Sequence, residues 1–171
     1  TPLYSSAASD VYKRQTTSTR TEYISAKGDD SFFFVIDQGR LAIWLNGVAA
    51  SWFYSTTTIN DGNWHHIAVT YNGNVLKGYI DGVERISHTK SASISTGTSS
   101  LEIGSRTNAS GGAYSFNFTG RMYDVRYWNV ARTASEISST MNTLLTGTET
   151  GLVSAFLSLI HISEPTRLRR I

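Results

Sequence analysis

Two adjacent histidines, His65 and His66, are the residues whose type and spacing most directly suggest chemistry. A histidine pair can bind a metal ion or supply a general base. The sequence around the pair favours an extended chain, and successive side chains of a strand point to opposite faces. The two rings therefore cannot chelate one ion from a regular strand, and catalysis would need further partners.

Paired carboxylates are the second kind of chemistry that the sequence could support. Glycoside hydrolysis uses two carboxyl groups at a defined separation. Asp81 and Glu84 are close in sequence, but they flank a turn at Gly82, where a structural role is sufficient. We expect no catalytic pair and no enzyme, because the glutamates of the expected domain occur singly, at Glu22, Glu84, Glu102, Glu136 and Glu149.

The stretch from Trp64 to Gly82 predicts the scaffold that would position such side chains. Apolar residues alternate with other residues up to Tyr71, which indicates a strand. Asn72-Gly73 tolerates the positive φ of a two-residue hairpin turn, so Val75 to Ile80 can return antiparallel. Asp81-Gly82 reverses the chain again. This stretch therefore predicts an antiparallel architecture.

The remaining chain predicts an all-β fold: a two-sheet antiparallel β-sandwich, or jelly roll, with one short C-terminal helix. Serine and threonine fill 44 of 171 positions and proline only two, which suits many short strands. Turn dipeptides recur about every eight to fifteen residues, as in sandwiches. The apolar run Phe32 to Ile36 is expected to be buried on both faces.

The helix is predicted from about Ala134 to Asn142. Thr133 precedes Glu136 by three residues, which is the spacing of a capping box. Helical spacing then predicts that Ile137, Met141 and Leu144 face the sandwich.

The two ends of the chain differ from the rest, and we expect residues 1–15 and 158–171 to be non-native tails. Both resemble translated read-through of sequencing adaptors at the edges of metagenomic reading frames, and such segments do not belong to the fold of a domain. The alternative is a native basic arm and tail. The tails carry Lys13, Arg14, Arg167, Arg169 and Arg170 against Asp10 and Glu164, a net charge of +3, so the formal +2 of the chain becomes 2 − 3 = −1 for residues 16–157.

Charge and composition limit the classes of partner. Arg106, Arg121, Arg126 and Arg132 are interleaved with acidic residues, so no nucleic-acid patch is predicted. The apolar run from Gly151 to Ile162 is about twelve residues, too short for a membrane-spanning helix, and we expect no membrane insertion. Zero cysteines exclude disulfides and thiolate metal sites.

Four motifs in order resemble the laminin-G-like jelly rolls of the concanavalin A-like lectin/glucanase superfamily. They are WHHIAVTYNGNVLKGYIDG, LEIGSR, FNFTGRMYDVRYWNVARTASEI and LLTGTETGLVSAF, and together they cover roughly residues 21–156. The resemblance implies two curved antiparallel sheets and a binding or adhesion role in a larger secreted or cell-surface protein. It places residues 16–157 in the domain, without the family's first strands, and it makes His66 a buried, hydrogen-bonded residue.

Members of this superfamily often hold calcium between loops at the rim of the sandwich. Hard oxygen ligands for Ca²⁺ could come from aspartate and asparagine side chains in the turns. The alternative is that the same side chains cap the backbone of those turns, or that the aspartate on the last long strand pairs with an arginine. The candidate calcium ligands are Asp29, Asp30, Asp61, Asn63 and Asp124.

A carbohydrate platform is the second site expected from this resemblance. Aromatic faces stack on sugar C–H groups while nearby polar groups bind hydroxyls. The candidates are Trp44, Trp52, Tyr54 and Tyr114, although large aromatic residues of a sandwich more commonly belong to its core. Trp64 and Trp128 are expected in the core, Trp128 near the start of the helix.

We therefore predict a non-catalytic module that binds a glycan or an extracellular protein. Two alternatives remain open. One is a glycoside hydrolase domain of the same superfamily, and the other is a ligand-free spacer in an adhesin or tail-fibre protein. The sequence does not predict the oligomeric state or the identity of the ligand.

Overall fold

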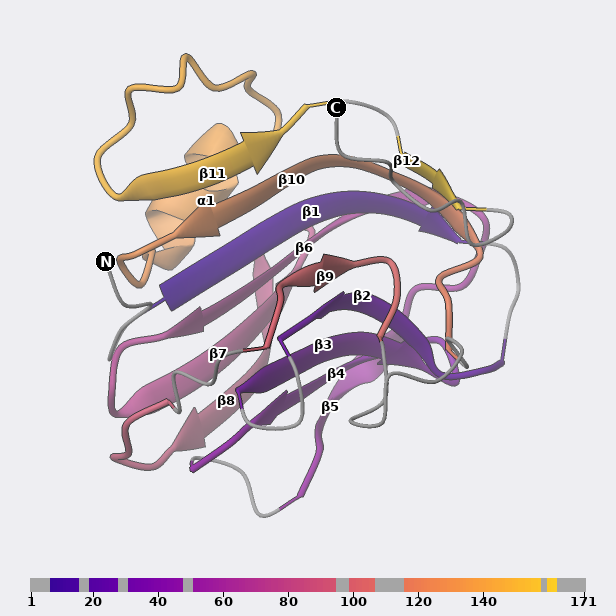
Figure 1. Cartoon of the computed structure of the whole chain (residues 1–171), viewed down its shortest axis with the longest axis horizontal. Coiled ribbons are helices and arrows are strands. Elements are labelled where there is room, and N and C mark those ends of the chain that lie inside the picture. Colours follow the sequence, from indigo (N-terminus) through magenta and orange to yellow (C-terminus); the bar gives the residue numbers. More distant parts are fainter. Residues whose placement is uncertain are drawn as a thin grey trace.

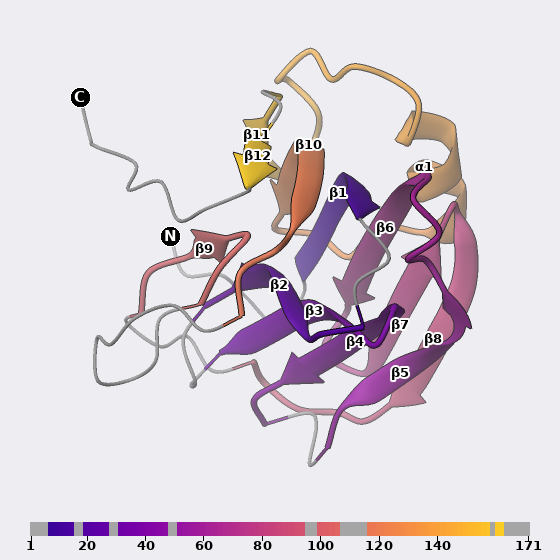
Figure 2. The same ribbon diagram turned by 90° about the vertical axis from the view of Figure 1, so that its right-hand side faces the viewer.

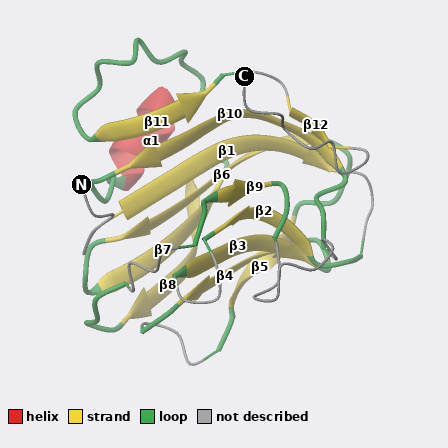
Figure 3. Cartoon of the chain, viewed as in Figure 1, coloured by secondary structure: helices red, strands yellow, loops and turns green. Residues whose placement is uncertain are grey.

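A computed structural model describes residues 7–15, 19–27, 31–47, 51–94, 99–106, 116–157 and 160–162. Within these ranges the chain forms two antiparallel sheets and one helix, which confirms the predicted all-β sandwich with one short helix (Figure 3). Figure 2 shows the sheets as two layers, with the helix on the outer side of the larger one.

The larger sheet combines strands from both ends of the sequence. Strand β12 (Ile160–Ile162) pairs with β10 beside β11. The order of the other strands is β11 (Leu152–Phe156), β10 (Gly120–Trp128), β1 (Ala7–Gln15), β6 (Trp64–Tyr71), β7 (Val75–Ile80) and β8 (Val83–Thr89).

The smaller sheet is built mainly from consecutive strands. Its order is β5 (Phe53–Thr58), β4 (Arg40–Leu45), β3 (Phe32–Asp37), β2 (Glu22–Ala26) and β9 (Glu102–Ile103). The run Phe32 to Ile36 is buried on both faces as predicted. Phe34 and Ile36 enter the core between the sheets, whereas Phe33 and Val35 join a second cluster on the outer face. The smaller sheet thus has two apolar faces.

The predicted hairpins form, with one shift in register. Tyr71 pairs with Leu76, and the Asn72 amide nitrogen donates to the Val75 carbonyl, so the tip of the hairpin is Gly73-Asn74 instead of Asn72-Gly73. The side-chain oxygen of Asn72 accepts hydrogen bonds from the backbone amides of Asn74 and Val75, so Asn72 caps the turn from its first side.

The second turn lies at Asp81-Gly82 as expected. Asp81 has a φ of 50° and Gly82 a φ of 76°. Positive φ at both central residues is the conformation that joins twisted antiparallel strands most directly.

The main departure from expectation concerns the N-terminal segment. We expected residues 1–15 outside the fold, but β1 lies between β10 and β6 in the larger sheet (Figure 1). Val11 is fully buried in the core between the sheets. Residues 160–162, expected in the C-terminal tail, likewise pair with β10. The hydrogen bonds between strands use backbone N–H and C=O groups, which nearly every residue carries. A segment can therefore pair as a strand even when its sequence does not resemble the family.

The helix α1 (Ala134–Thr140) begins with the predicted capping box between Thr133 and Glu136. Ile137 is buried against Ala68 of β6 and Tyr79 of β7, so α1 covers part of the outer face of the larger sheet. Leu144 was predicted to face the sandwich, but the helix ends before it and its side chain is 64% exposed. Among the described residues, no helix has the length and apolar character to span a membrane.

We expect Val11→Asp to lower the free energy of unfolding by about 3 kcal/mol or more, since a carboxylate would be placed in the apolar core. Denaturation by urea measures the change. Val83→Asp is the matched control, because Val83 lies exposed on the edge strand β8, and a change within about 0.5 kcal/mol is expected there. Equal effects of the two substitutions would mean that residues 7–15 do not belong to the folded core.

Candidate functional site

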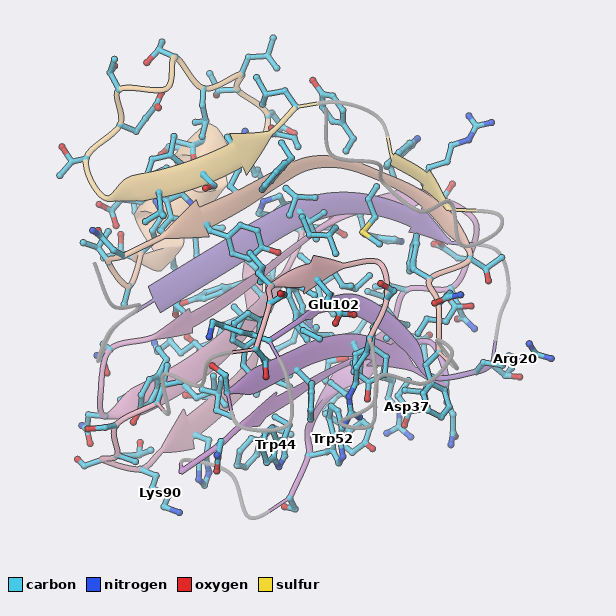
Figure 4. The ribbon with its side chains drawn as sticks, in the orientation of Figure 1. Arg20, Asp37, Trp44, Trp52, Lys90 and Glu102 are labelled. Carbon is cyan, nitrogen blue, oxygen red and sulfur yellow. The ribbon has the colours of Figure 1, made fainter. Side chains whose placement is uncertain are left out.

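The outer face of the smaller sheet carries a cluster of aromatic side chains, called here the aromatic face. Phe33 lies at its centre, with its ring centroid 5.0 Å from that of Trp44 and 5.9 Å from that of Trp52, both at 23° between ring planes. Trp44 and Trp52 are half-buried and lie beside the strands of this sheet in Figure 4. The aromatic face comprises Tyr23, Phe33, Trp44, Trp52, Tyr54 and Phe116.

Alternation along the strands explains why these rings share one side. Phe33 and Trp44 are cross-strand partners, as are Ala42 and Tyr54. Opposed residues of an antiparallel pair point to the same face. Because Phe33 and Ala42 belong to the outer cluster, Trp44 and Tyr54 lie on that face too.

Charged groups border the aromatic face. The Arg106 guanidinium lies 4.2 Å from the Phe33 ring centroid and donates a 2.9 Å hydrogen bond to the Tyr23 hydroxyl. Arg40 lies 5.6 Å from the Tyr54 ring centroid. Burial, followed by a hydrogen bond to Asp37, raises the pKa of the Tyr54 hydroxyl above its usual value. The face therefore offers rings, cations and hydroxyl groups together.

Three of the four predicted platform residues meet on the aromatic face. Trp44 and Trp52 both stack on Phe33, and Tyr54 is 43% exposed at its border. Tyr114 lies outside the described residues.

The expected calcium ligands have other partners where the structure describes them. The Asp61 carboxylate accepts hydrogen bonds from the amide and the side chain of Asn63, at 2.9 and 3.0 Å, and contacts the His65 ring at 3.0 Å. The backbone amide of Asn63, followed by its side chain and by His65, holds the pKa of Asp61 well below its usual range. Asp29 and Asp30 lie outside the described residues. Within the described part of the chain, no three histidine or acidic side chains form a group that could hold a metal.

The histidine pair does not form a shared site. His65 Nδ1 lies 2.8 Å from a carboxylate oxygen of Asp81, and His65 Nε2 lies 3.0 Å from Asp61, so its ring bridges two loops. His66 is buried at 2% exposure, as the resemblance implied. The structure therefore gives the two rings separate surroundings.

Sequence reasoning missed a cleft of about 330 Å³ beside the C-terminal end of α1. We call it the helix-side cleft. Trp64 was expected in the core but is 42% exposed, because α1 covers Ala68 and Tyr79 and leaves the start of β6 open. The cleft is lined by Trp64, Tyr123, Asp124, Met141, Asn142, Thr143 and Leu144.

A bulge in β10 turns two successive residues toward this cleft. Asp124 has a φ of 56°, and the β1–β10 register shifts at this point. Met122 and Val125 both enter the core, whereas Tyr123 and Asp124 between them line the cleft. An extra residue in one strand re-aims side chains in this way.

A buried ion pair anchors the bulge. Asp124 is 3% and Arg126 1% exposed, and Arg126 binds both carboxylate oxygens, its Nε donating at 2.8 Å. Arg126 also donates to the carbonyls of Thr140 at 3.0 Å and Thr143 at 2.7 Å. Asp124 thus pairs with an arginine, which was the alternative to a calcium role in the sequence analysis. Through Arg126 the pair also connects the segment after α1 to β10.

A comparison with known families identifies the superfamily of the chain. The family model of the concanavalin A-like lectin/glucanases superfamily, of laminin G type, matches residues 10–138. The chain belongs to this superfamily. The match begins within β1 and confirms the resemblance seen in the sequence. No curated protein sequence matches the chain significantly.

Solved structures share the fold at low sequence identity. A candidate carbohydrate-binding protein from Bacteroides ovatus has a TM-score of 0.76 at 18% identity, over 90% of this chain and 45% of its own. This chain therefore spans less than half of that protein. A heptameric SAP-like pentraxin from Limulus polyphemus has a TM-score of 0.65 at 18% identity, over 92% of this chain and 82% of its own.

A domain with a bound sugar is also similar. Domain 4 of an extracellular arabinanase from Geobacillus stearothermophilus, in complex with arabinotriose, has a TM-score of 0.60 at 19% identity. It matches 80% of this chain and 66% of its own. At such identities the likeness shows a common fold.

We expect Arg126→Met to lower the free energy of unfolding by about 3–5 kcal/mol, because it leaves the Asp124 carboxylate buried without its cation. Urea denaturation measures the loss. Arg121→Met on the same strand is the control, since Arg121 is exposed, and its change should stay within about 0.5 kcal/mol. A small loss for Arg126→Met would contradict a structural role for the pair.

The calcium expectation stays a prediction. If Ca²⁺ binds at the rim, a chelator should lower the melting temperature of the chain, since a ligand that binds only the native state stabilises it. Asp30→Asn should then abolish the difference between calcium and chelator. An unchanged melting temperature with chelator would remove the metal from this domain.

Proposed function

We propose that this chain is a non-catalytic module that binds a glycan on the aromatic face. The exposed ring of Tyr54 beside the half-buried rings of Trp44 and Trp52 carries the proposal. A row of rings on the outer side of a sheet offers flat apolar surface that fits the C–H faces of sugars. Arg40, next to Tyr54, can donate hydrogen bonds to hydroxyl groups.

The packing of Trp44 and Trp52 on buried rings favours a binding surface over a purely structural cluster. Phe33 is nearly buried and stacks on both Trp44 and Trp52, and the nearly buried Tyr23 packs edge-on against Phe33. Trp44 and Trp52 are thus fixed before any ligand arrives, so little side-chain entropy is lost on binding. The arabinotriose held by the similar arabinanase domain supports a sugar as the kind of ligand.

The surroundings of several carboxylates favour a binding module over a hydrolase. Asp81 contacts His65 and accepts from the His66 amide, whereas Glu84 pairs with Lys77 at 2.8 Å, so the two residues act separately. Glu136 belongs to the helix cap. Glu149 accepts hydrogen bonds from the backbone amides of Thr146 and Gly147. The bond from the Thr146 amide is the main cause that lowers the pKa of Glu149 to about 2. These carboxylates have local structural partners.

We also propose that the module acts outside the cell or at its surface, as part of a longer protein. The similar domain 4 belongs to an extracellular arabinanase, which supports this location. The matches to parts of longer proteins, such as the Bacteroides ovatus protein, support this arrangement.

We expect Tyr54→Ala and Trp52→Ala each to weaken glycan binding by roughly tenfold or more, as when an aromatic anchor is lost. A glycan array identifies the ligand, and titration calorimetry measures the affinities. Phe156→Ala is the matched control, since Phe156 is 44% exposed against 43% for Tyr54 but lies on β11 of the other sheet.

Three outcomes would overturn the proposal. A blank array would favour the spacer. Hydrolysis of a panel of β-glucans would favour the glycoside hydrolase. Binding that Phe156→Ala weakens as strongly as Tyr54→Ala would place the site elsewhere.

A further inference from the structure

We propose that the helix-side cleft is a second binding site, which takes one residue of a neutral sugar. It lies on the outer side of the larger sheet, whereas the aromatic face lies on the outer side of the smaller one. The two sites would therefore face opposite directions from one sandwich. This inference stands on the geometry of the cleft and does not depend on the proposed function of the aromatic face.

The cleft contains an exposed aromatic anchor. Trp64 is 42% exposed, and Leu144 beside the same cleft is 64% exposed. Large apolar side chains that remain open around a hollow are typical of ligand sites, because water contact there is unfavourable until a ligand covers them. The indole of Trp64 can stack on the C–H face of a sugar ring.

The walls of the cleft are fixed in the absence of a ligand. On one side, Arg126 holds the carbonyls of Thr140 and Thr143 and thereby fixes the segment after α1. On the other side, Trp64 begins β6, and the next residue, His65, lies outside the cleft but is held between Asp61 and Asp81. A site whose neighbours are already ordered loses less entropy when it binds.

The charge of the described lining residues favours a neutral ligand. Among the described lining residues the one charged group is Asp124, and both of its carboxylate oxygens are bound by Arg126. The described lining therefore offers no uncompensated charge to an ionic ligand. The polar groups of the lining include the exposed Asn142 amide, the Tyr123 hydroxyl and the Thr143 hydroxyl, which donates to the Ser139 carbonyl at 3.3 Å and keeps its acceptor capacity. An amide and a hydroxyl next to an indole suit a ligand with one apolar face and several hydroxyl groups.

The size of the cleft limits the ligand to a small group. Its volume of about 330 Å³ lies at the lower end of the range of about 300–1,000 Å³ found for ligand pockets. One sugar ring, or the end of a longer chain, fits that range better than an extended oligosaccharide. We therefore commit to a single neutral hexose residue.

Saturation-transfer NMR on the full chain tests this site, with the methyl glycosides of glucose, galactose and mannose as probes. We expect transfer from the protein to at least one of them. Trp64→Ala should abolish it, and Trp64→Phe should retain part of it because a ring remains. Tyr54→Ala, which changes the other sheet, should leave it intact, so the two proposals can fail separately. Near-ultraviolet circular dichroism of each variant verifies the fold.

The proposal would be overturned by three results. The first is the absence of transfer to all three glycosides. The second is transfer that survives Trp64→Ala but disappears with Tyr54→Ala, which would assign the sugar to the aromatic face. The third is a dimer in light scattering that Leu144→Asp separates, since the cleft would then be covered by a second copy of the chain.

Discussion

The larger sheet depends on the pairing of one strand, β1, with neighbours on both sides. β10 and β6 come from distant parts of the sequence and reach each other only through β1. Without that strand both would present unpaired backbone groups in the middle of the molecule, which is unfavourable. The same pairing positions Tyr123 and Trp64, which belong to β10 and β6, on either side of β1. The helix-side cleft therefore exists because β1 holds its two strands in register.

The two sheets use their outer faces differently. Each sheet buries one face in the shared core, as expected for a sandwich. The smaller sheet leaves a second apolar layer on its outer face, in which Phe33 stacks on the half-buried Trp44 and Trp52. The larger sheet covers part of its outer face with α1, and the covered area ends at the cleft. Among the described residues, exposed aromatic side chains thus occur on the aromatic face and in the helix-side cleft, as well as at Phe156 on β11.

The ion pair of Asp124 and Arg126 connects stability to the shape of the cleft. Removing two charges from water costs several kcal/mol for each ion, and their mutual attraction offsets this only with good geometry and further hydrogen bonds. Arg126 meets that condition through both carboxylate oxygens and two backbone carbonyls. The pair also stabilises a positive φ at Asp124, which a non-glycine residue rarely adopts. A structural interaction of this kind can shape a binding site without touching the ligand.

The sequence by itself determined the fold class, the hairpin turn at Asp81-Gly82, the capping box at Thr133 and the two-sided burial of Phe32 to Ile36. These features depend on local spacing and backbone preference, which a sequence displays directly. The resemblance named Trp44, Trp52 and Tyr54 as candidates together with Tyr114, and the strand pairing then showed that the first three share a face. Only the tertiary structure decided that residues 7–15 form a central strand, that Trp64 is exposed and that Asp124 pairs with Arg126. The first two depend on what lies across the sheet or beyond the end of the helix, and contacts between distant segments leave no local pattern in the sequence. Asp124 and Arg126 are close in sequence, but their pairing accompanies a bulge in β10 and the contact of Arg126 with the segment after α1.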